Sequence, residues 1–375
     1  MDDFKKIKEA IYGANRIAIL THDDPSQDAA GAALALFFSL KNINKIVNIP
    51  SLRNIPEPIA LLARKEEQKT FLISLKKNVS EIYYEKKDGE VKLYIKSKKE
   101  SIKLEDFSFG AITSRDIDGF SEINQEKKPA DLLISLGIEN FQTIEKTIEK
   151  NPDQYLPQIK IINIDNRDLN QKYADFNLVE KNSTLSQSCA HFLKNFGSSL
   201  VDKDVSNALL YGFASFLKGS KQASRQGSIL FLSWLAKNGA DFSLWADEEK
   251  EAPKQNLLAE TFKKIEFCGD AGFYCSALAE KDFESAGASP KDLGFVISKI
   301  KTRLFLPSFL LLWKAEAKNG SNKIMGIFYS DKEEYVEKMN QYFEGRKKGT
   351  GLVFLSRQSD LASAKKEALN AIGRQ

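Results

Sequence analysis

The chain has 375 residues, of which 42% are hydrophobic, enough to build apolar cores for two or three domains of roughly 100–200 residues each. Its formal net charge of +4 is too small to indicate a nucleic-acid partner by itself, and its three cysteines, which lack CxxC spacing, indicate neither a disulfide framework nor a zinc site. The charged start, MDDFKKIKEAI, lacks a signal-peptide core, and no apolar stretch approaches the roughly 20 residues of a membrane helix. We therefore expect a cytoplasmic protein that does not bind membranes.

The first part of the chain predicts a helix, a buried strand, a polar loop and a second helix. Phe4–Tyr12 has apolar residues at helical spacing, and Arg16–Leu20 is a short apolar run typical of a buried strand. A polar turn follows, and from Asp28 an Ala- and Leu-rich helix begins, whose small residues would allow close packing on a neighbouring strand. Lys45–Pro50 predicts the second strand of a βαβ unit. A polar loop between a strand end and a helix start is where open α/β sheets bind ligands.

That loop carries His22, Asp24 and Asp28, whose side chains are of the kinds that ligate metals. The run from His22 to Ala29, HDDPSQDA, resembles the first motif, His-x-Asn-Pro-Asp-x-Asp-Ala, of the DHH phosphoesterases, the superfamily of RecJ, the NrnA-type nanoRNases and exopolyphosphatase-related proteins. The His, the Pro and the second Asp match, but Ser26 stands where the motif has its first Asp. The resemblance implies a parallel-sheet domain followed by a smaller α/β substrate-binding domain, and hydrolysis of phosphoesters by two metal ions.

Residues of about 65–112 have a different character, with several short strand-like runs and a hairpin signal at Asp88-Gly89. We interpret them as an antiparallel β insertion. In the run Val91–Lys96, lysines alternate with tyrosine on one face, a pattern that would suit a nucleic-acid strand. We favour the simpler interpretation, in which these lysines lie on a solvated face and protect an edge strand.

The next two strands carry altered forms of the superfamily's motifs. Ala130–Leu136 is an apolar strand, and Gly137 follows where the family has an Asp that bridges two metal ions. Lys160–Asp165 is another strand, and its end, NIDNR (residues 163–167), resembles the NIDHH signature with both histidines replaced. Asp165 of that signature and the trailing Asn170 match. The resemblance therefore implies a site without its bridging carboxylate.

Two further helices complete this domain. Residues 183–196 predict a helix with Ser183 or Thr184 as its N-cap. In the apolar helix that begins at Asn207, Phe216 stands where the family has another metal-ligating Asp. A phenylalanine cannot bind a metal, so each of the two ions would keep a single good ligand.

Two dications that share a site need a bridging carboxylate and many negative ligands. We therefore favour His22, Asp24 and Asp28 as caps and loop contacts over an intact metal site, expect no cofactor, and leave open one weakly held Mn or Mg ion on these three residues. We assign no catalytic residue. From the resemblance, the predicted residues that bind a phosphorylated ligand lie at the end of the strand Lys160–Asp165 and just after it: Asp165, Asn166, Arg167 and Asn170.

The remainder predicts a helical connector at residues 216–265 and a second α/β domain at 266–375, after a DHH-like domain at 1–215. The second domain resembles the substrate-binding domain of the superfamily but lacks its arginine and histidine motifs. In its loop from Gly345 to Gly351, Arg346, Lys347 and Lys348 would form an anion cradle or a flexible basic turn, two interpretations that we hold as equal.

The sequence thus predicts a two-domain DHH-like α/β protein without two-metal hydrolysis. Whether it has any other enzymatic activity stays open. Its expected ligand is a nucleotide, a short oligonucleotide or another phosphorylated molecule, or else a protein partner, including a second copy of the chain. The alternative is a manganese-dependent phosphodiesterase or phosphatase, oligoribonuclease- or exopolyphosphatase-like, with a rebuilt site. A third hypothesis is a structural protein that uses the β insertion as its contact surface.

Overall fold

The computed structural model describes residues 2–50, 71–75, 81–87, 90–96, 107–111, 129–150, 152–197, 200–219, 226–245, 252–268, 272–304, 306–316 and 322–373. By its internal contacts the chain divides into one unit of residues 1–53 and 126–375 and a second of residues 54–125. Each is described by itself below.

The second unit contains two antiparallel strand pairs. β3 (Phe71–Leu75) pairs with β6 (Phe107–Ala111), and β4 (Glu81–Lys87) pairs with β5 (Glu90–Lys96). Lys87 lies opposite Glu90, so the predicted hairpin is confirmed, although its turn, residues 88–89, lies outside the described residues. The alternating lysine and tyrosine side chains of β5 lie outside them as well.

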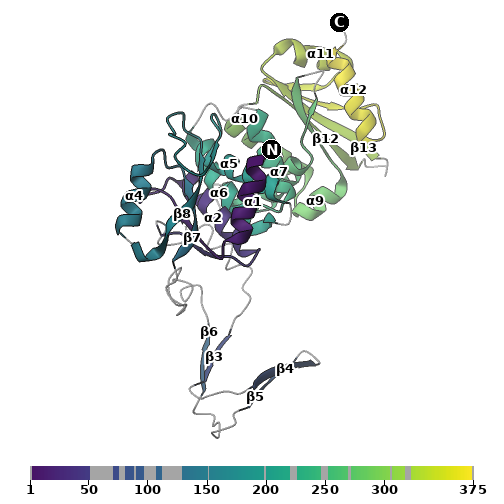
Figure 1. Ribbon diagram of the computed structural model, residues 1–375. Helices are drawn as coiled ribbons and strands as arrows, with labels where there is room; N and C mark the ends of the chain where they lie inside the picture. The colour runs from purple at the N-terminus through teal and green to yellow at the C-terminus, as the bar shows by residue number, and fades with distance from the viewer. Residues whose placement is uncertain are drawn as a thin grey trace. The chain divides into compact units, whose positions relative to one another are not determined.

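The larger unit begins with a five-stranded parallel sheet, in the order β2-β1-β7-β8-β9 (Figure 1). Three inner strands are nearly completely buried toward their carboxyl ends, as their apolar runs predict. The pairing of β7 with β8 shifts in register between Ala130 and Leu132. The strands are β1 (Arg16–Leu20), β2 (Ile46–Asn48), β7 (Ala130–Leu136), β8 (Tyr155–Asp165) and β9 (Phe176–Val179).

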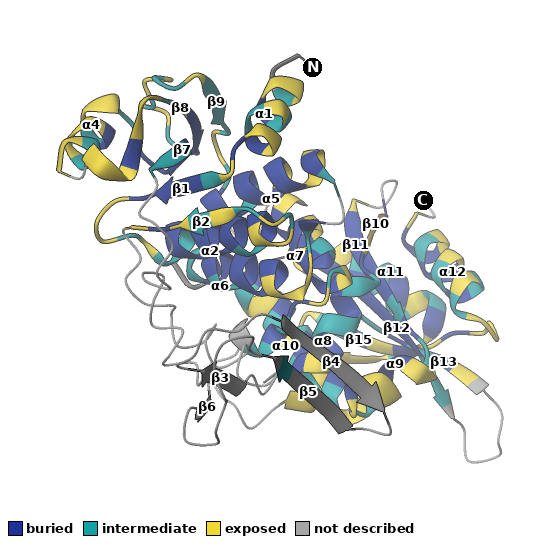
Figure 2. Ribbon diagram, turned by 60° about the horizontal axis from the view of Figure 1, so that its bottom comes forward, coloured by how far each residue is buried: buried dark blue, intermediate teal, exposed yellow. Residues whose placement is uncertain are grey.

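Helix α2 (Gln27–Lys41) is buried along most of its length (Figure 2). It contacts the strands of the sheet, as expected, and Gly31 adds a close contact with another helix. A Cβ atom on Gly31 would lie 2.6 Å from backbone atoms of Ala208 and Gly212 in α6 (Lys203–Gly219). The absence of a side chain at Gly31 therefore lets the two helices touch through their backbones. The other helices of this region are α1 (Asp2–Gly13), α4 (Phe141–Lys150) and α5 (Leu185–Phe196).

A second, six-stranded sheet has the order β10-β11-β12-β13-β15-β14 and is mixed, because only β11 and β12 pair in parallel. Apolar residues of α11 and α12 pack on its central strands. The expected α/β architecture is confirmed by these two sheets. The elements are α7 (Gln226–Lys237), α8 (Ala252–Lys263), β10 (Glu266–Cys268), β11 (Phe273–Leu278), α9 (Glu280–Ala286), α10 (Leu293–Leu304), β12 (Ser308–Glu316), β13 (Asn322–Ser330), α11 (Glu333–Phe343), β14 (Arg346–Lys348), β15 (Gly351–Leu355) and α12 (Leu361–Gly373).

Among the described residues, no helix combines the length and the apolar character that a membrane span requires.

Candidate functional site

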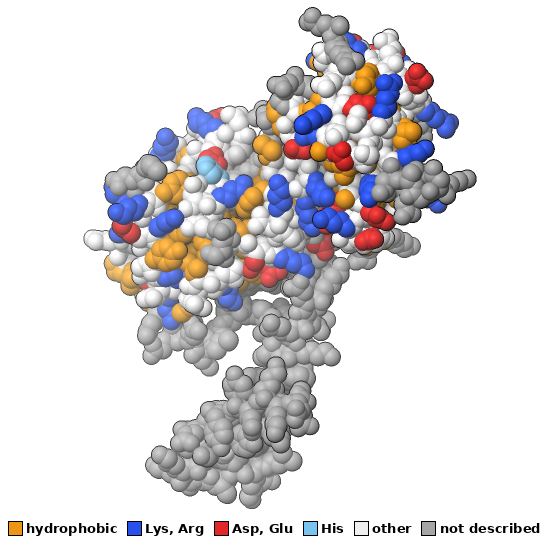
Figure 3. All heavy atoms as spheres, turned by 90° about the vertical axis from the view of Figure 1, so that its right-hand side faces the viewer, with side chains coloured by type: hydrophobic (Ala, Val, Ile, Leu, Met, Phe, Trp, Pro, Cys, Tyr) orange, Lys and Arg blue, Asp and Glu red, His pale blue; other side chains and the backbone are white. Residues whose placement is uncertain are grey.

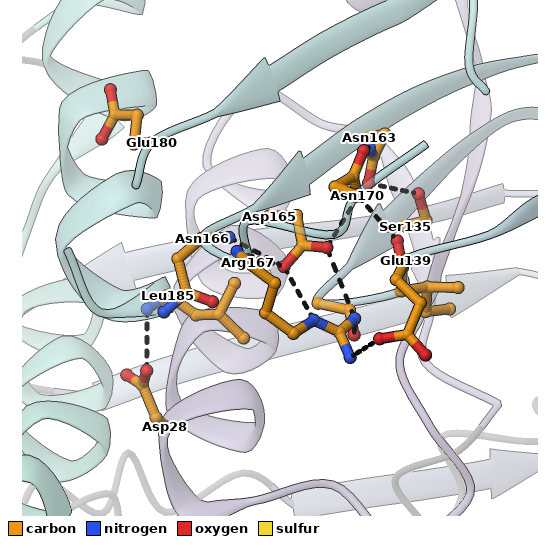
Figure 4. Close-up of polar contacts among 12 residues, drawn as sticks. Asp28, Ser135, Glu139, Asn163, Asp165, Asn166, Arg167, Asn170, Glu180 and Leu185 are labelled. Carbon is orange, nitrogen blue, oxygen red and sulfur yellow. Dashed lines mark hydrogen bonds and ion pairs between the residues drawn. The ribbon is translucent and has the colours of Figure 1, made fainter. Parts of the chain in front are cut away.

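The carboxyl ends of β1, β7 and β8 lie side by side in the parallel sheet, so the loops that carry the three altered motifs meet at one edge (Figure 4). This is the position that open α/β sheets use for ligands. The polar residues found there bind mainly to one another and to the backbone.

Asp28 uses both carboxylate oxygens to cap helix α5. Its Oδ2 accepts a hydrogen bond from the backbone N–H of Leu185 at 2.7 Å, and its Oδ1 accepts from the backbone N–H and the hydroxyl of Ser186 at 3.0 and 2.6 Å. Burial raises the pKa of the Asp28 carboxyl, and these hydrogen bonds oppose that rise. The N-terminus of a helix favours such a charge. Capping was the interpretation that we favoured for Asp28, but the capped helix is α5 and not its own.

Ser26, which stands where the motif has its first Asp, caps α2. Its hydroxyl accepts a hydrogen bond from the backbone N–H of Ala29 at 3.2 Å. A serine is among the best residues for this position, so the change from Asp to Ser preserves the helix start while it removes a carboxylate.

Arg167 lies at the end of β8 and reaches across to the loop after β7. Its guanidinium forms ion pairs with Glu139 at 2.6 Å and with Asp165 at 3.2 Å, and it donates a hydrogen bond to the carbonyl of Gly137 (Figure 4). The carbonyl of Gly137 belongs to the residue that stands in place of the bridging Asp. The backbone of the residue that replaces the bridging Asp is therefore held by an arginine that is itself paired with two carboxylates.

Gly137 could not carry a side chain without rearrangement. Its φ of +60° is in the left-handed region, and an added Cβ would lie 2.7 Å from the Cδ1 atom of Leu185. An aspartate here would therefore have a strained backbone conformation and would displace the end of the Leu185 side chain.

Asp165 is completely buried, and its charge is compensated by several donors. Besides Arg167, it accepts hydrogen bonds from the backbone N–H groups of Asn166 at 2.7 Å and Arg167 at 3.2 Å, and from the Nδ2 of Asn170 at 2.7 Å. The side chain of Asn166 donates to the carbonyl of Ser183 at 2.8 Å. The four predicted ligand-binding residues are therefore brought together, and each of them has partners inside the protein. Their role toward a ligand stays a prediction.

A buried polar network, which the sequence did not single out, supports this group from inside the sheet. Ser135 and Tyr173 share a hydrogen bond of 2.8 Å, and the Nδ2 of Asn163 donates to Asn170 at 2.9 Å and to Asn177 at 3.2 Å. Burial is the main cause that raises the pKa of Tyr173 to about 12. Ser135 and Asn163 are polar residues within otherwise apolar strands. Because buried polar groups need hydrogen-bond partners, these two residues could have indicated the network from the sequence.

The residues present do not fit a centre of two metal ions. His22 and Asp24 are exposed, and the described residues include no group of three or more His, Cys, Asp or Glu side chains positioned to hold a metal. Phe216 packs against Phe213, with ring centroids 5.6 Å apart. A single ion on His22, Asp24 and Asp28 stays a prediction, for which the capping bonds of Asp28 would have to open.

The expected cation loop of the second domain contains the short strand β14, Arg346–Lys348. Because neighbouring residues of a strand point to opposite faces, Arg346 and Lys347 diverge, and Lys347 forms an ion pair with Glu337 of α11. The side chains of Arg346 and Lys347 therefore point to opposite faces of the strand, and the role of Arg346, Lys347 and Lys348 toward an anion stays a prediction. Figure 3 shows Lys and Arg side chains interspersed with acidic and apolar ones on the face that it presents.

No family model and no curated protein matches the sequence. Similar solved structures include an exopolyphosphatase-related protein from Bacteroides fragilis, with 13% identity, a TM-score of 0.43 and coverage of 99% of this chain and 95% of that chain. Another is the exonuclease RecJ bound to manganese, with 11% identity, a TM-score of 0.26 and coverage of 100% and 94%. A third is a putative family II inorganic pyrophosphatase from Methanococcus jannaschii, with 10% identity, a TM-score of 0.30 and coverage of 95% and 99%. The solved structures to which the chain is similar thus include an exopolyphosphatase-related protein and RecJ, two kinds of protein from the superfamily that its first motif resembles.

Proposed function

We propose that this chain is a DHH-like protein that does not hydrolyse phosphoesters with two metal ions and that acts by binding a phosphorylated ligand. The observation that carries the proposal is the guanidinium of Arg167, bonded to the carbonyl of Gly137 and paired with Asp165 and Glu139. At the residue where the resemblance implies a shared carboxylate ligand, the chain thus has a glycine whose carbonyl is bonded to an arginine.

Electrostatics supports the loss of two-metal chemistry. Dications about 3.5–4 Å apart repel each other strongly unless a carboxylate lies between them. Asp28, the best matched carboxylate, already accepts three hydrogen bonds at the start of α5. A metal at Asp28 would have to replace these bonds.

Binding of a phosphate is supported by the exposure of the same arginine. The side chain of Arg167 is 35% exposed while its ion pairs hold it in place. Arginine suits phosphate oxygens because its planar group donates two parallel hydrogen bonds, and a pre-positioned side chain loses little entropy on binding. The ligand would be a nucleotide, a short oligonucleotide or another phosphorylated molecule.

Turnover is tested by incubating the protein with Mn²⁺ or Mg²⁺ and either a dinucleotide or an aryl phosphate. We expect no product above the level of a no-protein control. Hydrolysis that disappears in both His22→Ala and Asp28→Ala would overturn the proposal and support the manganese-dependent phosphodiesterase.

Binding is tested by thermal shift in EDTA with a panel of nucleotides and dinucleotides. A ligand at 100 times its Kd stabilises the folded state by about 2.7 kcal/mol, which raises Tm measurably. We expect this ligand-induced shift in the wild type and in Lys181→Met, which removes an exposed ion pair with Asp168, and its loss in Arg167→Met. If no phosphorylated compound shifts Tm, the binding proposal fails in favour of a protein partner.

A further inference from the structure

Two of the three cysteines, which are far from a CxxC spacing, meet in the second sheet. Cys268 ends β10 and Cys275 lies in β11, and these antiparallel strands pair Cys268 with Phe273 and Glu266 with Cys275. Because residues two apart share a face, the two cysteines are diagonal neighbours on the side of the sheet that faces α11 and α12. Their Sγ atoms are joined by a hydrogen bond of 2.7 Å.

The surroundings of the pair distinguish its two thiols. The hydrogen bond between the two sulfurs is the main cause that lowers the pKa of Cys268, and the ammonium group of Lys365 adds to it. The same hydrogen bond, together with burial, raises the pKa of Cys275. Lys365 is held there by an ion pair with Glu266 at 2.6 Å. The sulfur of Cys268 is thus the one favoured as the thiolate.

Access also differs between the cysteines. Cys268 is 7% exposed and Cys275 is 2% exposed, so both are reached only by a small reagent. Cys189 is completely buried in α5, burial raises its pKa, and its sulfur contacts the carbonyl of Ala32 at 3.5 Å. It has no second thiol beside it and serves as an internal reference.

We propose that Cys268 and Cys275 form a reversible dithiol–disulfide pair that is oxidised by a hydroperoxide. The Cys268 thiolate attacks the peroxide oxygen, the O–O bond breaks, and the departing oxygen takes a proton, which leaves a sulfenic acid on Cys268. Cys275 then attacks that sulfur and loses its proton, and the sulfenic oxygen leaves as water. With hydrogen peroxide, two thiols and one peroxide give one disulfide and two waters.

The disulfide would attach the three-residue edge strand β10 covalently to β11. The ring that it closes runs only from residue 268 to residue 275, so its effect is local to this edge of the sheet. This inference is independent of the proposed function, because the cysteines lie outside the group around Arg167.

The experiment starts from the reduced full-length protein, treated with stoichiometric hydrogen peroxide, denatured, alkylated with N-ethylmaleimide and measured by intact mass and peptide mapping. Reduced protein should take up three alkyl groups and oxidised protein one, on Cys189. Dithiothreitol should restore all three. Cys189→Ala should still form the disulfide, whereas Cys268→Ser and Cys275→Ser should not.

Three results would overturn the proposal. Oxidised wild type could retain three alkylatable thiols, the linkage could involve Cys189, or Cys268 could proceed to a sulfinic acid while Cys275 stays alkylatable. Each outcome is read on the wild type itself, so the test does not depend on the folding of any variant.

Discussion

Replacing Arg167 with methionine removes the charge that balances Asp165 while it keeps most of the side-chain volume. Breaking a buried ion pair from one side costs about 3–5 kcal/mol. Asp165 keeps the bonds from Asn166 and Asn170, both at 2.7 Å, which lowers this cost. The contact with Glu139 contributes less than about 1 kcal/mol, because the two side chains are 35% and 41% exposed. We expect Arg167→Met to lower the free energy of unfolding by about 2–3 kcal/mol.

The measurement is urea unfolding followed by far-UV circular dichroism, with the midpoint and slope giving the change in free energy. Lys181→Met is the matched control, since Lys181 and Asp168 form a pair at 3.2 Å whose side chains are 58% and 78% exposed. It should cost less than about 0.5 kcal/mol. If Arg167→Met costs no more than the control, the guanidinium does not hold this site together and the reasoning is wrong.

Three further predictions concern the frame of the site. Gly31→Ala places a Cβ atom 2.6 Å from the α6 backbone and should lower the free energy of unfolding by about 1–2 kcal/mol, although alanine has the better helix propensity. The control Gly13→Ala adds a Cβ with no atom within 4 Å and should be nearly neutral. Thermal unfolding of the two variants tests the difference. Thr184→Ala removes the capping box at the start of α5 and should cost about 1 kcal/mol in urea unfolding; a wild-type midpoint would contradict the cap. Burial raises the pKa of Tyr173 in the folded state to about 12, above its ordinary value of 10.0, so between these pH values the unfolded state ionises first and stability falls. The wild type should lose up to about 1.4 kcal/mol per pH unit there relative to Tyr173→Phe, and parallel pH profiles would refute this.

Local pattern predicted most of the fold. Arg16–Leu20 and Ala130–Leu136 are strands at the residues expected from their apolar runs, and Thr184 is an N-cap, as its side chain suggests. The shorter elements were missed. Glu266–Cys268 and Arg346–Lys348 are strands of only three residues, too short to show an alternation of apolar and polar residues. They form because a neighbouring strand supplies backbone hydrogen bonds.

The site was predictable in position but not in its connections. The motif residues that follow β1, β7 and β8 meet at one edge of the sheet, because these three parallel strands are neighbours. Sequence could not show that Asp28 binds a helix that begins at residue 185, or that Arg167 reaches the carbonyl of Gly137. Such contacts depend on how distant segments approach each other, and single-sequence patterns hold no information about these distances. The pairing of Cys268 with Cys275 was missed for the same reason.

Gly137 opposes a return to metal chemistry. An aspartate introduced there would have a strained left-handed backbone and would displace the side chain of Leu185. Ser26 and Phe216 would still stand where the resemblance implies two further ligands, so this one substitution does not rebuild the ligand set. Any attempt to engineer hydrolysis into this scaffold should therefore rebuild the loop after β7 and replace Arg167 in the same step.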